Sequence, residues 1–330
     1  MIMNTKFTKR ESAAINVAKS VAILSVIAAH VVPLAKTDLL SNFVSSSWNM
    51  FGRVGVIVFF VIGGFLYSRK DGDRKTFLKK KAFRIFIPWV FCSLLTYSIC
   101  LFSHPFFLVD YLKWMFGSGT WYYYATVYTL FIFVFKWVYK NDVILYSLIG
   151  VQTIVLIMKS IGFSTTLPFD FFTDYLNPLH WIGYFSAGII LRRKRFDIVL
   201  RENRTVLILS AIVSVISFLI LYKQEIHTYF NIITSIFCVS FSVLILRFSY
   251  WIAKFKVSNH VGKAGEYSFC IYLLHMQIVQ GVISKIPEGI VKIIYSPFVG
   301  LFLMLFLISI GLWICKKFPF GDKIKMLVGL

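Results

Sequence analysis

Apolar runs long enough to cross a membrane recur along the whole of this sequence. About 20 helical residues span the ~30 Å hydrocarbon core of a bilayer. Ten runs of roughly that length cover residues 12–33, 48–67, 85–103, 121–139, 143–161, 178–191, 205–222, 229–247, 267–284 and 297–315. With 58% hydrophobic residues and a mean hydropathy of +0.77, the chain is too apolar for a soluble core. We predict an all-α polytopic membrane protein of about ten transmembrane helices, with a single membrane domain over residues 1–330.

The basic residues follow the gaps between these runs. With the N-terminus inside, 27 of the 35 Lys and Arg residues fall in cytoplasmic segments and seven outside, while Lys19 lies within a span. By the positive-inside rule, both termini are expected in the cytoplasm. The net charge of +21 therefore reports membrane topology, so lipids rather than nucleic acid are the expected surroundings. We predict a multi-pass protein of the cell inner (cytoplasmic) membrane.

The five cysteines fall inside or at the ends of apolar runs and form no CxxC pair. Such cysteines pack as small hydrophobic side chains. The sequence predicts neither a disulfide nor a metal site.

Ionisable residues within spans are costly in a bilayer and therefore informative. Lys19 and His30 lie 11 residues apart on the first run, a separation that returns to within about 20° of the same helix face, about 16 Å along the axis. Lys19 is expected toward the cytoplasm and His30 near the outer boundary. They form either a functional face or a snorkelling lysine and an interfacial histidine. His275 is expected near mid-membrane on the ninth run.

Three other positions bear on binding. Arg53 is expected at the outer end of the second run, where it faces an anionic or hydroxyl-rich acceptor or lipid headgroups. Lys81 and Arg84 lead into the third run, whose N-terminus and cations suit a cytoplasmic phosphate site. Trp121 begins the fourth run, where it either joins an interfacial aromatic belt or stacks on a sugar.

Five segments in this order resemble the acyltransferase-3 family of integral membrane acyltransferases. They are INVAKSVAILSVIAAHV (15–31), GRVGVIVFFVIGGFL (52–66), KKKAFRIFIPW (79–89), GTWYYYATVY (119–128) and GEYSFCIYLLH (265–275). The resemblance implies transfer of an acyl group, usually acetyl from acetyl-CoA, to a sugar hydroxyl across the membrane. No tightly bound cofactor is expected, and the partners are an acyl-CoA donor and a glycan or lipid-linked oligosaccharide acceptor.

Carried over residue by residue, the resemblance assigns His30 to the family's first-span histidine and Lys19 to its upstream basic residue. It places the family's Arg-x-x-Arg on Lys81 and Arg84, and the histidine after Tyr-Leu-Leu on His275. Lysine replaces arginine at 19 and 81, which keeps the charge but loses the bidentate fork. The segment from Arg84 to Pro88 is one residue longer than the commonest form.

These residues predict an O-acyltransferase in which His30 is the catalytic base, because an imidazole with a pKa near 6.5 can accept a hydroxyl proton at neutral pH. Lys19, Lys81 and Arg84 would bind the CoA phosphates, and Arg53, Trp121 and His275 the substrates. Two alternatives remain open. One is a transporter or flippase for a glycan or its lipid-linked precursor. The other is a subunit that delivers acyl groups to a separate periplasmic transferase.

Overall fold

The computed structural model describes residues 7–32, 38–67, 82–100, 105–165, 171–195, 198, 202–287 and 289–330. Within these ranges every regular element is helical. Six helices are long and apolar enough to cross a membrane: α1 (Lys9–Val31), α2 (Leu39–Tyr67), α7 (Asp142–Ser160), α10 (Arg204–Lys223), α11 (Ile232–Ile252) and α15 (Ile290–Cys315). The structure is therefore that of an all-helical, multi-pass membrane protein.

Shorter helices occupy the other predicted runs. Three of them are apolar but have fewer than 18 residues: α4 (Ile87–Cys100), α6 (Tyr123–Val138) and α14 (Ser268–Ile283). The sixth predicted run contains α8 (Ile182–Arg193), only 12 residues long and preceded by the 3-10 turns η2 (Asp174–Leu176) and η3 (Pro178–His180). The count of ten spans and the cytoplasmic termini stay predictions.

The start of α2 differs from the prediction. This helix begins nine residues before the expected position 48, because its first turns are built from the stretch Leu39–Trp48, whose serine hydroxyls bond within the helix. Hydropathy alone does not detect such turns. Short helices also lie outside the predicted runs: α5 (Leu108–Phe116), α12 (Ser258–Val261), α13 (Lys263–Glu266) and, after α15, α16 (Gly321–Leu327).

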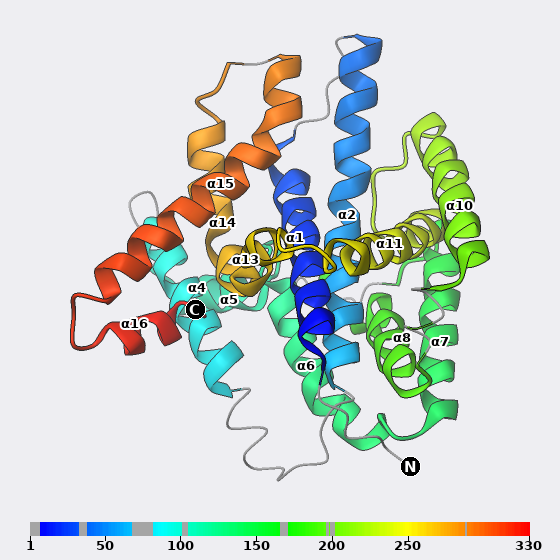
Figure 1. The fold of residues 1–330 in the computed structure, drawn as a ribbon, viewed down its shortest axis with the longest axis horizontal. Helices are drawn as coiled ribbons and strands as arrows, with labels where there is room; N and C mark the ends of the chain where they lie inside the picture. Colours follow the sequence, from blue (N-terminus) through cyan, green and yellow to red (C-terminus); the bar gives the residue numbers. More distant parts are fainter. Residues whose placement is uncertain are drawn as a thin grey trace.

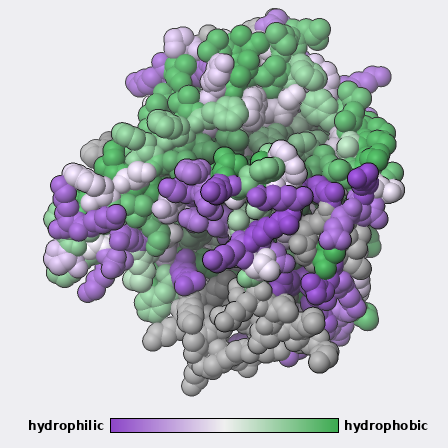
Figure 2. Space-filling view, viewed as in Figure 1, coloured by the Kyte–Doolittle hydropathy of each residue, from purple (hydrophilic) through white to green (hydrophobic). Residues whose placement is uncertain are grey.

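The helices α1 and α2 lie in the middle of the molecule, with α14 and α15 on one side and α7, α8 and α10 on the other (Figure 1). In its most apolar 18-residue window, α2 is 78% buried, whereas α7 and α10 are only 17% buried. Because α7 and α10 are also strongly apolar, their exposed faces are suited to lipid. The hydrophilic residues of the face in Figure 2 gather in a band across its middle, and hydrophobic residues cover the part above.

Small side chains allow α1 and α2 to approach closely. A Cβ atom on Gly55 would lie 2.3 Å from the carbonyl oxygen of Ala22. The Ser25 hydroxyl fills the seam, since it donates to the Phe51 carbonyl at 2.6 Å and accepts from the Gly55 amide at 2.8 Å. This is the packing of small residues that membrane helices use in place of a hydrophobic driving force.

The opposite side of α2 meets α8 in the same way. A Cβ atom on Gly64 would lie 2.0 Å from the Phe185 carbonyl oxygen, and one on Gly188 would lie 2.0 Å from the Val61 carbonyl oxygen. Gly64 and Gly188 thus bring the two helices together, and α2 is held between α1 and α8.

Gly55→Ala should destabilise the protein by about 1–3 kcal/mol, because the new methyl group must push α1 away from α2. Gly150→Ala on α7 is the matched control, since its Cβ would meet no atom within 4 Å and alanine favours helix by up to about 1 kcal/mol. The measurement is the thermal unfolding midpoint of each purified variant in detergent. Equal midpoints for the two variants would contradict the close seam.

Candidate active site

The two histidines that the sequence placed at different depths lie side by side. His30 is in the last turn of α1 and His275 is in α14, and their ring centroids are 5.2 Å apart with the planes inclined by 49°. His275 is fully buried, whereas His30 is partly exposed. The amide of Gln280 also donates to the His30 carbonyl, at 3.4 Å. The predicted base and the histidine predicted to bind substrate therefore lie at one site.

The tautomer of His275 follows from its one hydrogen bond. Its Nδ1 atom lies 2.8 Å from the carbonyl oxygen of Tyr272, and a carbonyl can only accept, so the hydrogen is assigned to Nδ1. In the neutral ring Nε2 then carries a lone pair. This Nε2 atom is buried and has no hydrogen-bond partner within the described residues. The His275 Nε2 lone pair, beside His30, can therefore accept a hydrogen bond.

Trp121 reaches the same place from the segment that precedes α6. Its ring centroid lies 6.3 Å from that of His275 and 5.3 Å from that of Trp114, in edge-on arrangements. The ring is 9% exposed. An interfacial belt would leave the indole at the membrane surface, whereas here it faces the histidine pair. Its Nε1 atom is buried without a partner among the described residues.

The segment that carries Trp121 is tied to α14 by two tyrosines. The Tyr272 hydroxyl donates to the Trp121 carbonyl, and the Tyr122 hydroxyl donates to the Leu273 carbonyl at 2.9 Å. The sequence reading missed both tyrosines. Tyr272 could have been found, because a residue three positions before His275 shares its helix face.

A cavity of about 1,040 Å³ borders this site at Tyr272. Its wall includes Lys19 from α1, Arg84 before α4 and Tyr272 from α14. The structure therefore brings two of the three predicted donor-binding cations to one cavity, while Lys81 lies outside the described residues. Aromatic residues supply much of the remaining wall: Phe59, Phe83, Tyr124, Tyr128 and Phe269.

Arg84 lies in a π-helical turn, η1 (Ala82–Phe86), that runs directly into α4. A π turn closes its hydrogen bond over one more residue than an α turn, and such turns occur frequently at functional sites. The π turn continues into α4 without a break.

Arg53 is not among the residues that line the cavity. Its side chain is 4% exposed. The guanidinium donates to Asn49 Oδ1, to Met50 Sδ at 3.0 Å and to the Ile226 carbonyl at 3.4 Å. These contacts fix Arg53 between α2 and the segment after α10, apart from the cavity wall.

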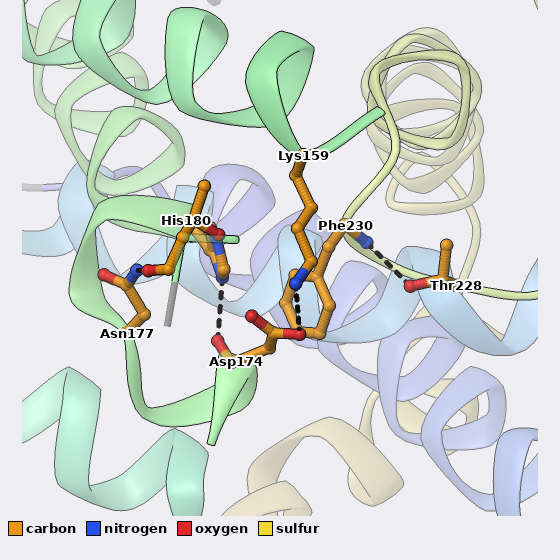
Figure 3. Close-up of polar contacts among 7 residues, drawn as sticks. Lys159, Asp174, Asn177, His180, Thr228 and Phe230 are labelled. Atoms are coloured by element: carbon orange, nitrogen blue, oxygen red, sulfur yellow. Dashed lines mark hydrogen bonds and ion pairs between the residues drawn. The ribbon is translucent and has the colours of Figure 1, made fainter. Parts of the chain in front are cut away.

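His180 provides a contrast with His275 (Figure 3). Its Nδ1 lies 2.7 Å from the Asp174 carbonyl oxygen and its Nε2 lies 2.9 Å from the Thr165 hydroxyl. Asp174 in turn forms an ion pair with Lys159 at 2.9 Å. Both ring nitrogens are used, so His180 holds the turns before α8 and has no atom left for chemistry. Among the described residues no group of three or more His, Cys, Asp or Glu could hold a metal ion.

A family model described as an acyltransferase domain matches residues 12–316. The chain belongs to the acyltransferase-3 family. No curated protein and no solved structure matches it. The match confirms the family predicted from the five sequence segments, and this acyltransferase is a membrane enzyme whose domain fills nearly the whole chain.

His180→Ala should lower the stability of this acyltransferase by about 2 kcal/mol or more, because it removes a buried side chain with two hydrogen bonds. Acyl transfer per folded molecule should be unchanged. The measurements are the unfolding midpoint in detergent and the turnover of the folded fraction. Lost turnover at normal stability would show that His180 belongs to the reaction.

Proposed function

We propose that this protein is a transmembrane O-acyltransferase. It would move an acyl group, acetyl by family resemblance, from cytoplasmic acetyl-CoA to a hydroxyl of an extracytoplasmic or lipid-linked glycan, with His30 as the catalytic base. The proposal includes ten transmembrane spans in the cell inner (cytoplasmic) membrane, with both termini in the cytoplasm. The observation that carries it is the single cavity that joins Lys19 and Arg84 to Tyr272, which holds His275 beside His30.

The cavity suits a large anionic thioester. Its volume of about 1,040 Å³ is at the upper end of the range for ligand sites, about 300–1,000 Å³. Lys19 and Arg84 offer charge-assisted contacts to phosphate, and the aromatic wall offers apolar contact to the pantetheine arm. The phosphates would lie at the cations and the thioester would point toward Tyr272.

The histidine pair supports a base that is oriented by a second imidazole. The Tyr272 carbonyl keeps the hydrogen of His275 on Nδ1, so Nε2 can accept a hydrogen bond. A ring N–H of His30 that donates to this Nε2 would leave the other His30 nitrogen free to take a proton. The same logic orients the histidine of a catalytic triad through a third group.

The reaction then balances without another reactant. The acceptor hydroxyl oxygen attacks the thioester carbon as its proton passes to His30, which forms the C–O bond and an oxyanion. Collapse of this intermediate breaks the C–S bond, and the thiolate of CoA takes the proton from the His30 imidazolium. The products are the acylated hydroxyl and free CoA.

His30→Ala should reduce turnover by about 10²- to 10⁴-fold, the usual contribution of a general base, with CoA binding retained. His260→Ala is the control, because His260 is exposed in the α12 segment. The measurement is acceptor-dependent release of CoA by purified protein. If the wild type releases no CoA, the transporter or the donor-subunit function gains. If His275→Ala alone abolishes turnover, the two histidines exchange roles.

Arg84→Ala should weaken CoA binding roughly tenfold or more, because a hydrogen bond to a charged group contributes about 1.5–3 kcal/mol. Arg204→Ala removes the same charge at the exposed start of α10 and is the matched control. Isothermal titration of CoA into each variant in detergent gives the comparison. Equal affinities for the two variants would remove Arg84 from the donor site.

A further inference from the structure

Trp121 differs from the other well-packed indoles in what its nitrogen meets. Trp89 Nε1 donates to the Met115 carbonyl at 2.9 Å, Trp114 Nε1 to the Thr96 hydroxyl at 3.2 Å and Trp181 Nε1 to the Tyr175 carbonyl at 3.0 Å. The Trp121 nitrogen is buried and makes no hydrogen bond of good geometry within the part of the chain that the structure describes, although its side chain interacts with the neighbouring Tyr122 hydroxyl. A buried donor without an acceptor is rare, because it has lost its bond to water and gained none in return.

The surroundings prevent this indole from turning toward another acceptor. The Trp121 carbonyl is held by Tyr272, and the next residue is held twice, because the Tyr122 hydroxyl bonds both Leu273 and Thr96 at 2.9 Å. The Trp121 ring also packs against the rings of Trp114 and Tyr122, with centroids 5.3 and 5.0 Å away. The fold therefore keeps the N–H in a fixed, dry position.

The Trp121 ring lies close to the histidine pair that contains the proposed base. The Trp121 ring lies 6.3 Å from His275, whose ring lies 5.2 Å from His30. Attack of a hydroxyl on a thioester places negative charge on the former carbonyl oxygen, and fixed donors aimed at that oxygen lower the barrier. An indole nitrogen only donates, so it complements an oxyanion and cannot compete with His30 for the proton.

We propose that Trp121 is a catalytic residue whose Nε1–H donates a hydrogen bond to the oxyanion of the tetrahedral intermediate. The inference rests on the proposed acyl transfer and adds the group that stabilises its intermediate. As the hydroxyl oxygen bonds to the thioester carbon and His30 takes the proton, the carbonyl electron pair moves to oxygen and meets the Trp121 N–H. When this electron pair forms the carbonyl double bond again, the C–S bond breaks. The departing thiolate takes the proton from the His30 imidazolium. Trp121 gains and loses no atom.

The sharpest test replaces the N–H alone. Trp121 is exchanged for 3-benzothienylalanine, which has sulfur in place of the indole N–H and nearly the same shape. Turnover in acceptor-dependent CoA release should fall about 10²- to 10³-fold, as when one oxyanion donor is removed. CoA affinity should stay the same. The unfolding midpoint should not fall, because the lost N–H makes no hydrogen bond of good geometry among the described residues.

Trp181 supplies the matched control, since the same exchange there removes a bond that is made. That variant should unfold at a lower temperature and keep its turnover per folded molecule. Trp121→Phe is a second variant that should lose turnover to a similar extent. If the benzothienylalanine variant at 121 turns over within threefold of the wild type, or loses stability as the Trp181 control does, the proposal is overturned. A wild type that transfers no acyl group would instead overturn the proposed function itself.

Discussion

The close approach of α1 to α2 is the constraint on which the rest of the structure depends. The Ser25 hydroxyl and Gly55 lie at the contact between these two helices. The remaining surface of α1 contacts α11, α13, α14 and α15. The same helix carries Lys19 to the cavity and His30 to the histidine pair. A change in the tilt of α1 would therefore move Lys19, proposed to bind the donor, and His30, the proposed base, together.

At the middle of α1, next to Lys19, a second serine also bonds two backbone groups. The Ser20 hydroxyl donates to the Val261 carbonyl at 2.6 Å and accepts from the Gly265 amide at 2.7 Å. Gly265 must remain small, because its Cβ would lie 1.9 Å from the Asn16 carbonyl oxygen. The short helices α12 and α13 are thus fixed against α1 next to Lys19, and α14 starts from a defined point. In a membrane interior such buried hydroxyls are satisfied by backbone groups, since water cannot serve them.

Much of this arrangement could be read from the sequence, and the limits have physical causes. The apolar runs predicted the helices, and the first run placed Lys19 and His30 on one helix, 11 residues apart. These features depend on the local sequence pattern and could therefore be predicted. The neighbour of His30 could not be predicted, since the contact with His275 depends on how α14 packs against α1. The sequence left Trp121 open between an interfacial aromatic belt and a substrate-binding role, because aromatic side chains at the start of a span have the same composition whether they face headgroups or a ligand. The sixth run predicted α8 but not the 3-10 turns before it, because hydropathy averages these turns with the helix.

The length of the elements at the reaction centre has a further consequence. His275 lies in the middle of α14, and Trp121 lies two residues before α6. Each of these helices has 16 residues, about 24 Å of helix, whereas α15 has 26 residues, about 39 Å. The hydrocarbon core of a bilayer is ~30 Å thick, so neither α6 nor α14 alone would span it. A bilayer that thins to match these two helices would bring the water on its two sides closer together at the proposed site. A donor arm and an acceptor hydroxyl can then meet without either one crossing the full membrane.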